Sequence, residues 1–515
     1  MIVDLHNSDN TTEDCDVLVI GGGTAGLLLT AQLHEKGHKV VCVESGGYAQ
    51  ATETHELNTV IQRGSTYEGA ALGRFRCLGG TSTRWGGAMI PFLDIDLEQG
   101  EWPIGMNNLE EFIPRLEKIF NLFEGGFDGS SFSFQNKNFI TREAKWPPFK
   151  KRNVYRLFKG LLNAKNGPRV YINATVTHFN VSSESLDVVS AQAKNGIRLI
   201  IKAKKIIIAS GCIESTRLLL LLNKQNPSSG SIKSSSLGEG FHDHLSCVVA
   251  DLEVKDRKKL NRLVGFEFSK NGGMKNIRFE MNSNSEFRKI IPPCFFHVSF
   301  DQSNGQFYAL RAILRSLQKM SFPDISDVLT LLKGLPWLVK ALYWKVRYRK
   351  MLYPEGSSVH LHAVIEQQSI KTNQIKLSET EVDSLGVPLA EINWKVTEDD
   401  RLNLIRAVDA FSEWWNTSSL NDIATLNLRS KTELMNTIGN CGGIYHPGGT
   451  TKMSHINTEG VVDKNLKVFG IDNLWVVSTS VMPSGGAANP TMTLLLLALK
   501  CADDINAQLC SAIAN

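Results

Sequence analysis

The sequence predicts an α/β protein of Rossmann type, discontinuous along the chain, joined to a second part of α+β type with an antiparallel sheet. The Rossmann-type part is predicted by three segments in which an apolar strand leads into an apolar helix, namely 15–37, 206–223 and 474–500. Apolar and polar residues alternate in 360–368 and 388–396, which predicts half-buried strands of an antiparallel sheet in the second part. A chain of 515 residues is long enough for two such domains.

Composition and charge exclude several classes of protein. Apolar residues make up 42% of the chain and charged residues 21%, as in a folded globular protein. A net charge of +4 is too small to predict a nucleic-acid partner. The 9 cysteines are scattered, which favours free thiols in a reducing compartment. The polar start of the chain is no secretory signal and no long apolar run occurs, so we expect a cytoplasmic protein without a transmembrane helix.

The first element is a glycine-rich turn between a strand and a helix. Residues 15–20 form the predicted strand, 21–26 read Gly-Gly-Gly-Thr-Ala-Gly, and a second strand ends at Glu44, which Ser45 follows. Gly21 permits the tight turn, Gly23 permits a pyrophosphate to approach the backbone, and Gly26 permits close helix–strand packing. An anion at the helix N-terminus and a ribose on Glu44 complete a dinucleotide site. This motif alone does not separate FAD from NAD.

Two further glycine-containing segments predict backbone that lies against a flat ligand. Residues 73–87 contain a short polar run between paired glycines, which suits close approach of backbone to a charged, planar group. Residues 206–223 form a strand, a Ser210-Gly211 turn and a helix, as expected for a later strand of the same sheet.

The C-terminal region carries the most informative motif. His446 lies in IYHPGGTTKMS (444–454), and Ser478 follows a buried strand at 474–477. Asn489 and Pro490 predict a helix start, with asparagine as the N-cap and proline at the first helical position. The positive end of that helix would face whatever Asn489 contacts.

Together these motifs resemble the glucose–methanol–choline (GMC) oxidoreductase family from end to end. They are GGGTAG, GGTS…WGG, ASGCIES…LL, the F-x-D-H at 241–244, HPGGT and NPTMT, in the family's order. The segment SVMPSGGAANPTMT is most similar to the branch of pyranose oxidase and the gluconate, fructose and sorbitol dehydrogenases. Two positions depart from relatives. Arg84 stands where pyranose oxidase has its flavin-linked histidine, and Ser478 stands where many members have aspartate.

The resemblance implies a p-hydroxybenzoate-hydroxylase-like FAD domain and noncovalent FAD, with no metal. We expect the FAD-binding domain at 1–100, 165–250 and 440–515, and the substrate domain at 101–164 and 251–439. The residues expected to bind the cofactor are Gly21, Gly23, Thr24, Ala25, Gly26, Glu44, Ser45, Arg76, Gly79, Gly80, Thr81, Ser82, Trp85, Gly86, Val176, Ser210, Ser478, Asn489, Pro490 and Thr491.

The resemblance also implies the chemistry. His446 would take the hydroxyl proton of an alcohol while the flavin takes a hydride, and Asn489 would donate a hydrogen bond to the substrate oxygen. The expected substrate is a sugar, polyol or sugar-like alcohol, with oxygen, a quinone or a carrier protein as electron acceptor. Two alternatives stay open, a lyase with a structural flavin and a non-catalytic flavin-binding protein.

Other candidate sites have weaker support in the sequence. The pairs His242/His244 and His360/His362 have the spacing of one strand face, but no further ligand pair supports a metal. The sequence contains no G-x-S-x-G elbow, so it does not predict a Ser-His-Asp hydrolase. Glu214 and Arg217 are expected to be structural.

The segment 328–353 is apolar, aromatic and basic, without an acidic residue, and Pro336 divides it into two short helices. It is either a packing helix pair whose lysines reach solvent or a surface that meets a membrane or a lipid-linked substrate. In the second case Trp337, Tyr343 and Trp344 would lie at the interface, and the protein would be peripheral to the membrane.

Overall fold

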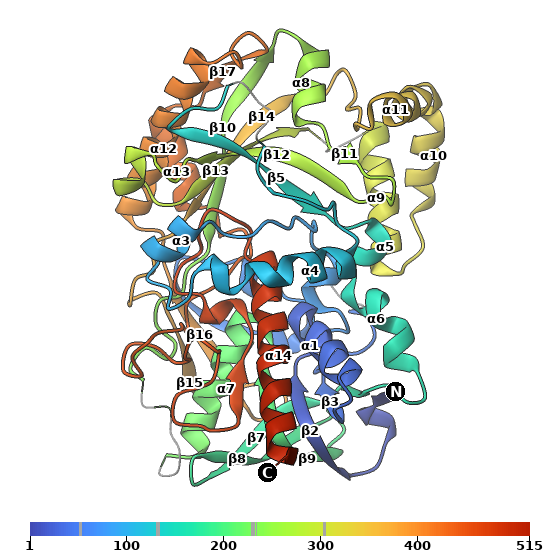
Figure 1. Ribbon diagram of the computed structural model, residues 1–515, viewed down its shortest axis with the longest axis vertical. Coiled ribbons are helices and arrows are strands. Elements are labelled where there is room, and N and C mark those ends of the chain that lie inside the picture. The colour runs from blue at the N-terminus through green and yellow to red at the C-terminus, as the bar shows by residue number, and fades with distance from the viewer. Residues whose placement is uncertain (51–53, 130–133, 228–231, 233, 302–304, 515) are drawn as a thin grey trace.

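The structure, a computed structural model, describes residues 1–50, 54–129, 134–227, 232, 234–301 and 305–514. Figure 1 shows two layered parts, one above the other, with both chain ends in the lower part. Each part has its own hydrophobic core. The predicted fold class is confirmed: a Rossmann-type α/β part and a part built on an antiparallel sheet.

The lower part is built on an eight-stranded sheet. Its order is β1 (Ile2–Asp4), β6 (Arg169–Ile172), β3 (Val40–Val43), β2 (Thr11–Ile20), β9 (Arg198–Ile208), β8 (Ser185–Gln192) and β7 (Thr175–Ser182), with β18 (Leu474–Val476) also on β9. The strands from β1 to β9, and β18, run parallel, whereas β9, β8 and β7 form an antiparallel meander. Strand β2 begins earlier than residue 15 because its first residues pair with the start of β9.

Helices cover this sheet. Helix α1 (Thr24–Glu35) packs against α6 (Val154–Asn163) and against the C-terminal helix α14 (Thr491–Ala514), which runs the height of the lower part in Figure 1. Helix α7 (Gly211–Gln225) follows β9. The helix predicted to start at Asn489 begins at Thr491, so Pro490 precedes it and the Asn489 side chain contacts other groups instead of capping it.

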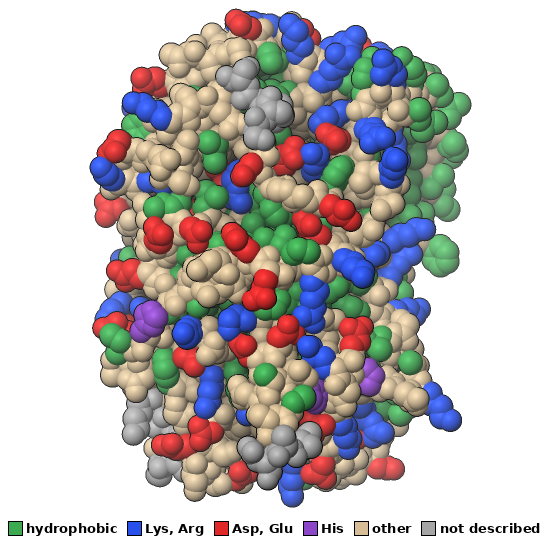
Figure 2. Space-filling model, in the orientation of Figure 1, with side chains coloured by type: hydrophobic (Ala, Val, Ile, Leu, Met, Phe, Trp, Pro, Cys, Tyr) green, Lys and Arg blue, Asp and Glu red, His purple; other side chains and the backbone are tan. Residues whose placement is uncertain are grey.

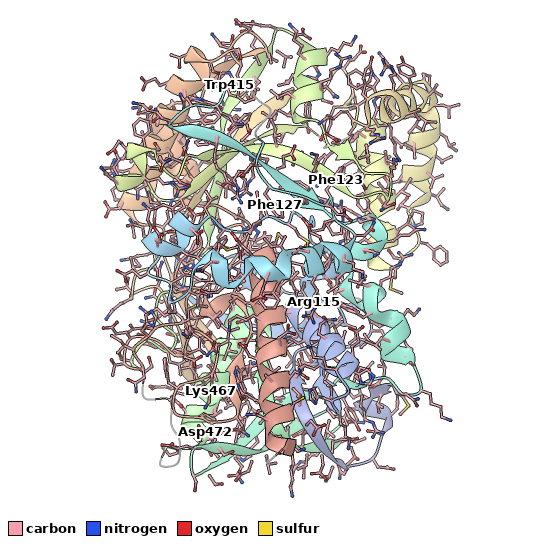
Figure 3. All side chains as sticks on the ribbon, in the orientation of Figure 1. Arg115, Phe123, Phe127, Trp415, Lys467 and Asp472 are labelled. Atoms are coloured by element: carbon pink, nitrogen blue, oxygen red, sulfur yellow. The ribbon has the colours of Figure 1, made fainter. Side chains whose placement is uncertain are left out.

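Helix α4 (Ile113–Phe120) crosses the front of the molecule between the two parts, as Figure 3 shows with Arg115 pointing down from it. The Arg115 guanidinium donates to both carboxylate oxygens of Asp503 on α14, at 3.0 Å each, and to Gln32 on α1. One side chain therefore joins three helices. Short helices α2 (Gly69–Leu72), α3 (Asp94–Gln99) and α5 (Phe149–Arg152) complete this region.

The upper part is a seven-stranded sheet. Its order is β11 (Glu267–Phe268), β12 (Met274–Met281), β13 (Cys294–Phe300), β14 (Val359–Glu366), β10 (His244–Val254) and β17 (Ala424–Leu428), with β5 (Phe139–Trp146) also on β12. Helix α12 (Glu398–Thr417) covers one face, where Phe411 stacks on Phe296 at 3.9 Å between ring centroids and Trp415 is buried. Helix α8 (Arg257–Val264) contacts strand β12, and helix α13 (Lys431–Gly439) contacts strand β10. Helices α9 (Gly305–Lys319), α10 (Ile325–Lys333) and α11 (Leu335–Tyr348) form one side of the upper part.

The strand predicted at 388–396 lies in a different sheet from the one expected. Strand β16 (Pro388–Trp394) pairs with β15 (Gln374–Val382) and with β4 (Val60–Gly64) in a separate three-stranded sheet beside α7, so the prediction that it joins the 360–368 strand is wrong. An alternating pattern indicates one buried face but does not identify the strands that pair with it. No helix among the described residues is long and apolar enough to span a membrane.

Candidate active site

A cavity of about 570 Å³ extends from the β2–α1 turn to His446 and Asn489, within the usual size range of ligand pockets. Every residue expected to contact the cofactor lies on its wall except Gly26 and Gly79. Gly26 lies behind the turn, where an added Cβ would be 1.8 Å from the carbonyl oxygen of Gly21. Gly79 has φ +90°, and an added Cβ would approach Asn153 Oδ1 to 2.8 Å. Both glycines therefore shape the loops that line the cavity.

The glycine turn leaves a helix end open toward the cavity. Gly21 has φ +111°, a left-handed conformation that favours glycine. Gly23 is the N-cap of α1 and provides no side-chain cap, and a Cβ there would meet nothing within 4 Å. The first amides of α1 are thus available to an anion, which the helix dipole also favours.

Glu44 directly follows β3, at the other side of this turn. Its carboxylate accepts from the backbone N–H of Gly22 and of Gly46, both at 2.8 Å, so it holds the glycine turn as well as lining the cavity. Burial raises the pKa of Glu44, and those two amides oppose the shift. The lone pairs that remain can accept from ribose hydroxyls.

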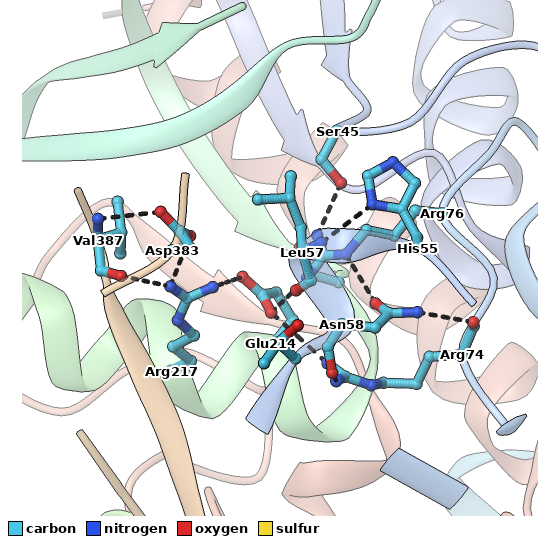
Figure 4. Close-up of polar contacts among 12 residues, drawn as sticks. Ser45, His55, Leu57, Asn58, Arg74, Arg76, Glu214, Arg217, Asp383 and Val387 are labelled. Atoms are coloured by element: carbon cyan, nitrogen blue, oxygen red, sulfur yellow. Dashed lines mark hydrogen bonds and ion pairs between the residues drawn. The ribbon is translucent and has the colours of Figure 1, made fainter. Parts of the chain in front are cut away.

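A buried ionic cluster supports the wall next to Glu44 (Figure 4). Arg76 donates to Ser45 Oγ at 2.8 Å and to Glu214 at 2.7 Å. Glu214 also pairs with Arg74 and Arg217. Although burial raises the pKa of Glu214, the Arg76, Arg217 and Arg74 guanidiniums lower it to about 2. The full set of partners agrees with the structural role expected for Glu214 and Arg217.

These observations fit FAD as the occupant of the cavity. An open helix N-terminus suits the pyrophosphate, Glu44 suits the adenosine ribose, and the cavity continues past Ser82, Trp85 and Gly86 to the polar groups at its far end.

His446 lies at that far end, after Tyr445, whose backbone has φ +70°. Buried Asp243 fixes this conformation, since its carboxylate accepts from the backbone N–H of Tyr445 at 3.0 Å and of His446 at 2.8 Å. Non-glycine residues held in this region are strained and often occur at functional sites.

The hydrogen bonds of His244 assign the tautomer of His446. His244 Nε2 lies 2.8 Å from the carbonyl oxygen of Gly486, which only accepts, so Nε2 carries the proton and Nδ1 is an acceptor. His446 Nδ1 lies 3.1 Å from His244 Nδ1 and therefore donates to it. His446 Nε2 is then unprotonated, and it lies 3.4 Å from Asn489 Nδ2.

Arg278 on β12 orients Asn489. Its Nη1 donates to Asn489 Oδ1 at 3.1 Å and its Nη2 to the carbonyl oxygen of Ala487 at 3.1 Å. Since Asn489 Oδ1 accepts from Arg278, the amide N–H₂ is directed to the His446 side. Glu280 lies between Arg278 and Arg142, with Glu280 Oε2 2.9 Å from Arg142 Nη1.

Both histidines are neutral at physiological pH. Burial, followed by His244 and Arg278, lowers the pKa of His446 to about 3. Burial also lowers the pKa of His244 to about 4. A neutral imidazole with a bare Nε2 can accept a proton at any pH above these values.

Asp243, His244 and His446 are close enough together to suggest a metal site. However, the Asp243 carboxylate already accepts from Tyr67 Oη at 2.7 Å and from the backbone N–H of His244, Tyr445 and His446. The two imidazoles also bond to each other, so these groups are satisfied without an ion. At the second histidine pair, His360 Nδ1 instead forms a hydrogen bond with Asp251 Oδ1 at 2.7 Å.

Sequence reasoning missed Arg278 and the contact of His244 with His446. The signal for Arg278 was present, because Arg278 and Glu280 are charged residues that alternate with apolar Ile277, Phe279 and Met281 at the end of the strand. Such a pair lies on one strand face and needs partners if buried.

Comparisons with known proteins bear on the cofactor and on the class of enzyme. Residues 369–498 match the family model of GMC oxidoreductases, and residues 16–55 match an FAD binding domain. The chain is 21% identical to 2-methyl-1,2-propanediol dehydrogenase of Mycolicibacterium austroafricanum, over 96% of each chain. It is 31% identical to the fructose dehydrogenase large subunit of Gluconobacter japonicus, over 28% of this chain and 25% of that one.

Among solved structures, pyridoxine 4-oxidase of Mesorbium loti superposes with a TM-score of 0.59 at 15% identity, over 95% of this chain and 99% of that chain. That likeness concerns the fold. The chain is an FAD-dependent oxidoreductase, with an FAD binding domain match at 16–55 and a GMC oxidoreductase match at 369–498.

Proposed function

We propose that this protein oxidises a CH–OH group of a neutral sugar, polyol or similar alcohol, with His446 as general base and Asn489 as hydrogen-bond donor to the substrate oxygen. The observation that carries the proposal is the bare Nε2 of His446, which lies 3.4 Å from Asn489 Nδ2 on the wall of the cofactor cavity. This long contact is easily replaced by a substrate hydroxyl that donates to His446 and accepts from Asn489.

In this reaction the hydroxyl proton moves to His446 Nε2, the C–H bond breaks with its electron pair leaving as hydride, and a C=O bond forms. FAD, when bound, supplies the two-electron acceptor for the hydride. His244 keeps the His446 proton on Nδ1, so the lone pair of Nε2 always faces the cavity. General-base catalysis of this kind typically contributes ~10²–10⁴-fold.

Asn489 and Arg278 act on the charge that develops on the substrate oxygen as its proton leaves. Asn489 Nδ2 donates to that oxygen, and the Arg278 guanidinium behind Asn489 Oδ1 polarises the amide. A single donor of this type is typically worth ~10²–10³ in rate.

The charges around the site favour a neutral alcohol over a cationic one. Arg278 and Arg142 share one carboxylate, Glu280, which leaves a net positive charge in a buried region. Burial raises the pKa of Glu366 to about 8, so this neighbour of Gly486 is protonated at neutral pH and does not offset that charge. A quaternary ammonium alcohol would therefore be repelled, which supports the sugar and polyol class.

The test is anaerobic reduction of the bound flavin by a panel of sugars, polyols, small diols and choline, followed in the visible spectrum. We expect a neutral polyhydroxy compound to bleach the flavin and choline to leave it oxidised. His446→Ala should slow reduction at least ~10²-fold and Asn489→Ala ~10–10³-fold with FAD still bound. His455→Ala, an exposed histidine outside the cavity, is the matched control.

Each alternative gives a different result in the same assay. A lyase with a structural flavin would convert its substrate without bleaching, and a non-catalytic flavin-binding protein would show neither change. Wild-type reduction rates in both His446→Ala and Asn489→Ala would refute the assigned pair. Reoxidation of the reduced protein with oxygen, a quinone or a carrier protein would then identify the electron acceptor.

A further inference from the structure

Helices α10 and α11 expose an apolar surface that the oxidation reaction does not use. On α11, Leu335, Val339, Leu342 and Val346 follow the 4-3-4 spacing of one helix face, and each is between 55% and 77% exposed. A stripe with this spacing normally faces a protein core. Here it faces solvent.

Helix α10 carries a second stripe of the same kind. Ile325, Leu329 and Leu332 are 53–76% exposed, and no residue of this helix is buried. Phe322, just before α10, is 98% exposed. Figure 2 shows the result as a continuous hydrophobic area along the edge occupied by α10 and α11 in Figure 1. Contiguous patches of this extent mark interaction surfaces rather than ordinary solvent-facing surface.

The opposite face of α11 holds the helix on the protein. Trp344 is buried, and the Trp337 ring packs edge-on against Phe307 at 6.0 Å between centroids. The expectation that both tryptophans would lie at an interface is therefore wrong, whereas Tyr343 does lie on the exposed side. Helix α11 therefore has two apolar faces, one that packs on the protein and one that faces solvent.

Cations border the exposed stripe. Lys345 and Arg347 lie about 100° to either side of it on the helix, and Lys333 ends α10. Between residues 305 and 348 the chain has seven basic residues and two acidic ones. Two of the six cations of segment 328–353 are neutralised by acids outside it, since Lys340 pairs with Glu355 and Lys350 with Glu267. In the described part of the chain, Lys333, Lys345 and Arg347 have no ion pair in the structure.

We propose that this surface, defined as the exposed stripes of α10 and α11 with Phe322 and their bordering cations, docks the protein on an anionic lipid bilayer. Aliphatic side chains bordered by lysine and arginine match the acyl and headgroup layers of such a bilayer. A second copy of the chain fits less well, because a symmetric contact between the stripes would bring the unpaired cations of both copies together.

The surface is connected through helix α9 to the loop that lines the cofactor cavity. At the end of α9, Gln318 is buried and its amide donates to the carbonyl oxygens of Ser82 and Trp85, both at 3.1 Å, in the loop that lines the cavity. Helix α10 packs on α9. Docking would therefore fix the orientation of the cavity relative to the bilayer.

The test is co-sedimentation of the full-length holoprotein with vesicles of phosphatidylcholine alone and of phosphatidylcholine mixed with phosphatidylserine, at about 50 mM and about 0.5 M salt. We expect binding to the anionic vesicles at low salt and release at high salt. L335S/V339S/L342S/V346S should lower the partition coefficient at least ~10-fold, through lost apolar burial. K333Q/K345Q/R347Q should lower it ~10²-fold on anionic vesicles and little on neutral ones.

Matched controls carry the same changes elsewhere on the surface. I290S/V382S/L402S/L428S removes four exposed aliphatic residues, and K371Q/K431Q/K464Q removes three exposed cations, outside α9–α11. Retained flavin absorbance shows that each variant is folded.

Wild-type protein that stays in the supernatant with anionic vesicles, or controls that lose binding as much as the α10–α11 variants do, would overturn the proposal. A wild-type dimer in sedimentation velocity that the serine variant converts to monomer, without vesicle binding, would assign the surface to a second copy instead.

Discussion

Glu214→Gln tests whether the ionic cluster beside the cavity stabilises the fold. The substitution keeps the size of the side chain and removes its charge, which leaves Arg74, Arg76 and Arg217 facing one another without their shared carboxylate. Burial already lowers the pKa of Arg74 to about 9, so this region tolerates excess positive charge poorly.

The magnitude follows from the pKa of Glu214. It falls from 4.5 to about 2 on folding, and at about 1.4 kcal/mol per pH unit this corresponds to about 3 kcal/mol. Breaking a buried ion pair by removal of one partner typically costs about 3–5 kcal/mol, a similar value. Because the folded pKa is depressed, this stability is present above pH 4.5 and is lost as the pH falls from 4.5 toward 2.

The assay is urea unfolding of wild-type and Glu214→Gln holoprotein at saturating FAD, at pH 7 and at pH 4. We expect the variant to be about 3 kcal/mol less stable at pH 7 and the gap to narrow by about 1 kcal/mol at pH 4. Glu433→Gln, which removes the exposed partner of Arg429, is the control and should cost less than about 1 kcal/mol. A Glu214 variant as stable as this control, or a gap that does not change with pH, would refute the reasoning.

Three further predictions concern the cofactor and the base. Glu44→Ala should weaken FAD binding ~10-fold or more, because the ribose and the amides of Gly22 and Gly46 lose their acceptor; fluorescence titration of the apoprotein measures this, and an unchanged Kd would remove Glu44 from the site. Because Arg84 stands where pyranose oxidase has its flavin-linked histidine, acid precipitation should release all the flavin into the supernatant, and a yellow pellet would contradict noncovalent binding. Because burial lowers the pKa of His446 to about 3, the imidazole ¹⁵N signals of His446 should not titrate between about pH 5 and 8 in NMR spectra of histidine-labelled protein; signals of His446 that titrate near pH 6.5 would contradict this, whereas an inflection in the reduction rate could come from Asp243, whose pKa burial raises to about 7.

The local parts of the site could be predicted from the sequence, because their geometry depends on neighbouring residues. Gly21, Gly23 and Gly26 are needed for a turn within one βα unit, and the structure has that turn with the left-handed φ at Gly21. The two helices on either side of Gly334 could also be predicted from the sequence, because Pro336 divides the segment. The domain boundaries stay a prediction, and the pairing of β4 with β16 joins segments that were assigned to different domains.

Contacts between distant segments could not be predicted in the same way. Arg278 contacts Asn489 across 211 residues, and His244 contacts His446 across 202. No periodicity within β12 or β10 indicates which loop lies opposite, since that depends on how the two sheets pack. The exposure of α11 is a similar case, because the sequence pattern is the same whether the apolar stripe is covered or open.

In the proposed mechanism, Arg278 acts on both the base and the substrate oxygen. Its positive charge, with burial and His244, makes protonated His446 less stable and thus lowers the pKa of the base. The same charge, transmitted through the Asn489 amide, stabilises negative charge on the substrate oxygen. A weaker base at His446 makes transfer of the hydroxyl proton less favourable, whereas a stabilised substrate oxygen makes it more favourable. We therefore expect the proton to be neither fully transferred nor fully retained before the C–H bond breaks. On the proposed mechanism we therefore infer that the proton leaves together with the hydride, which would avoid a full charge on either partner in a buried site.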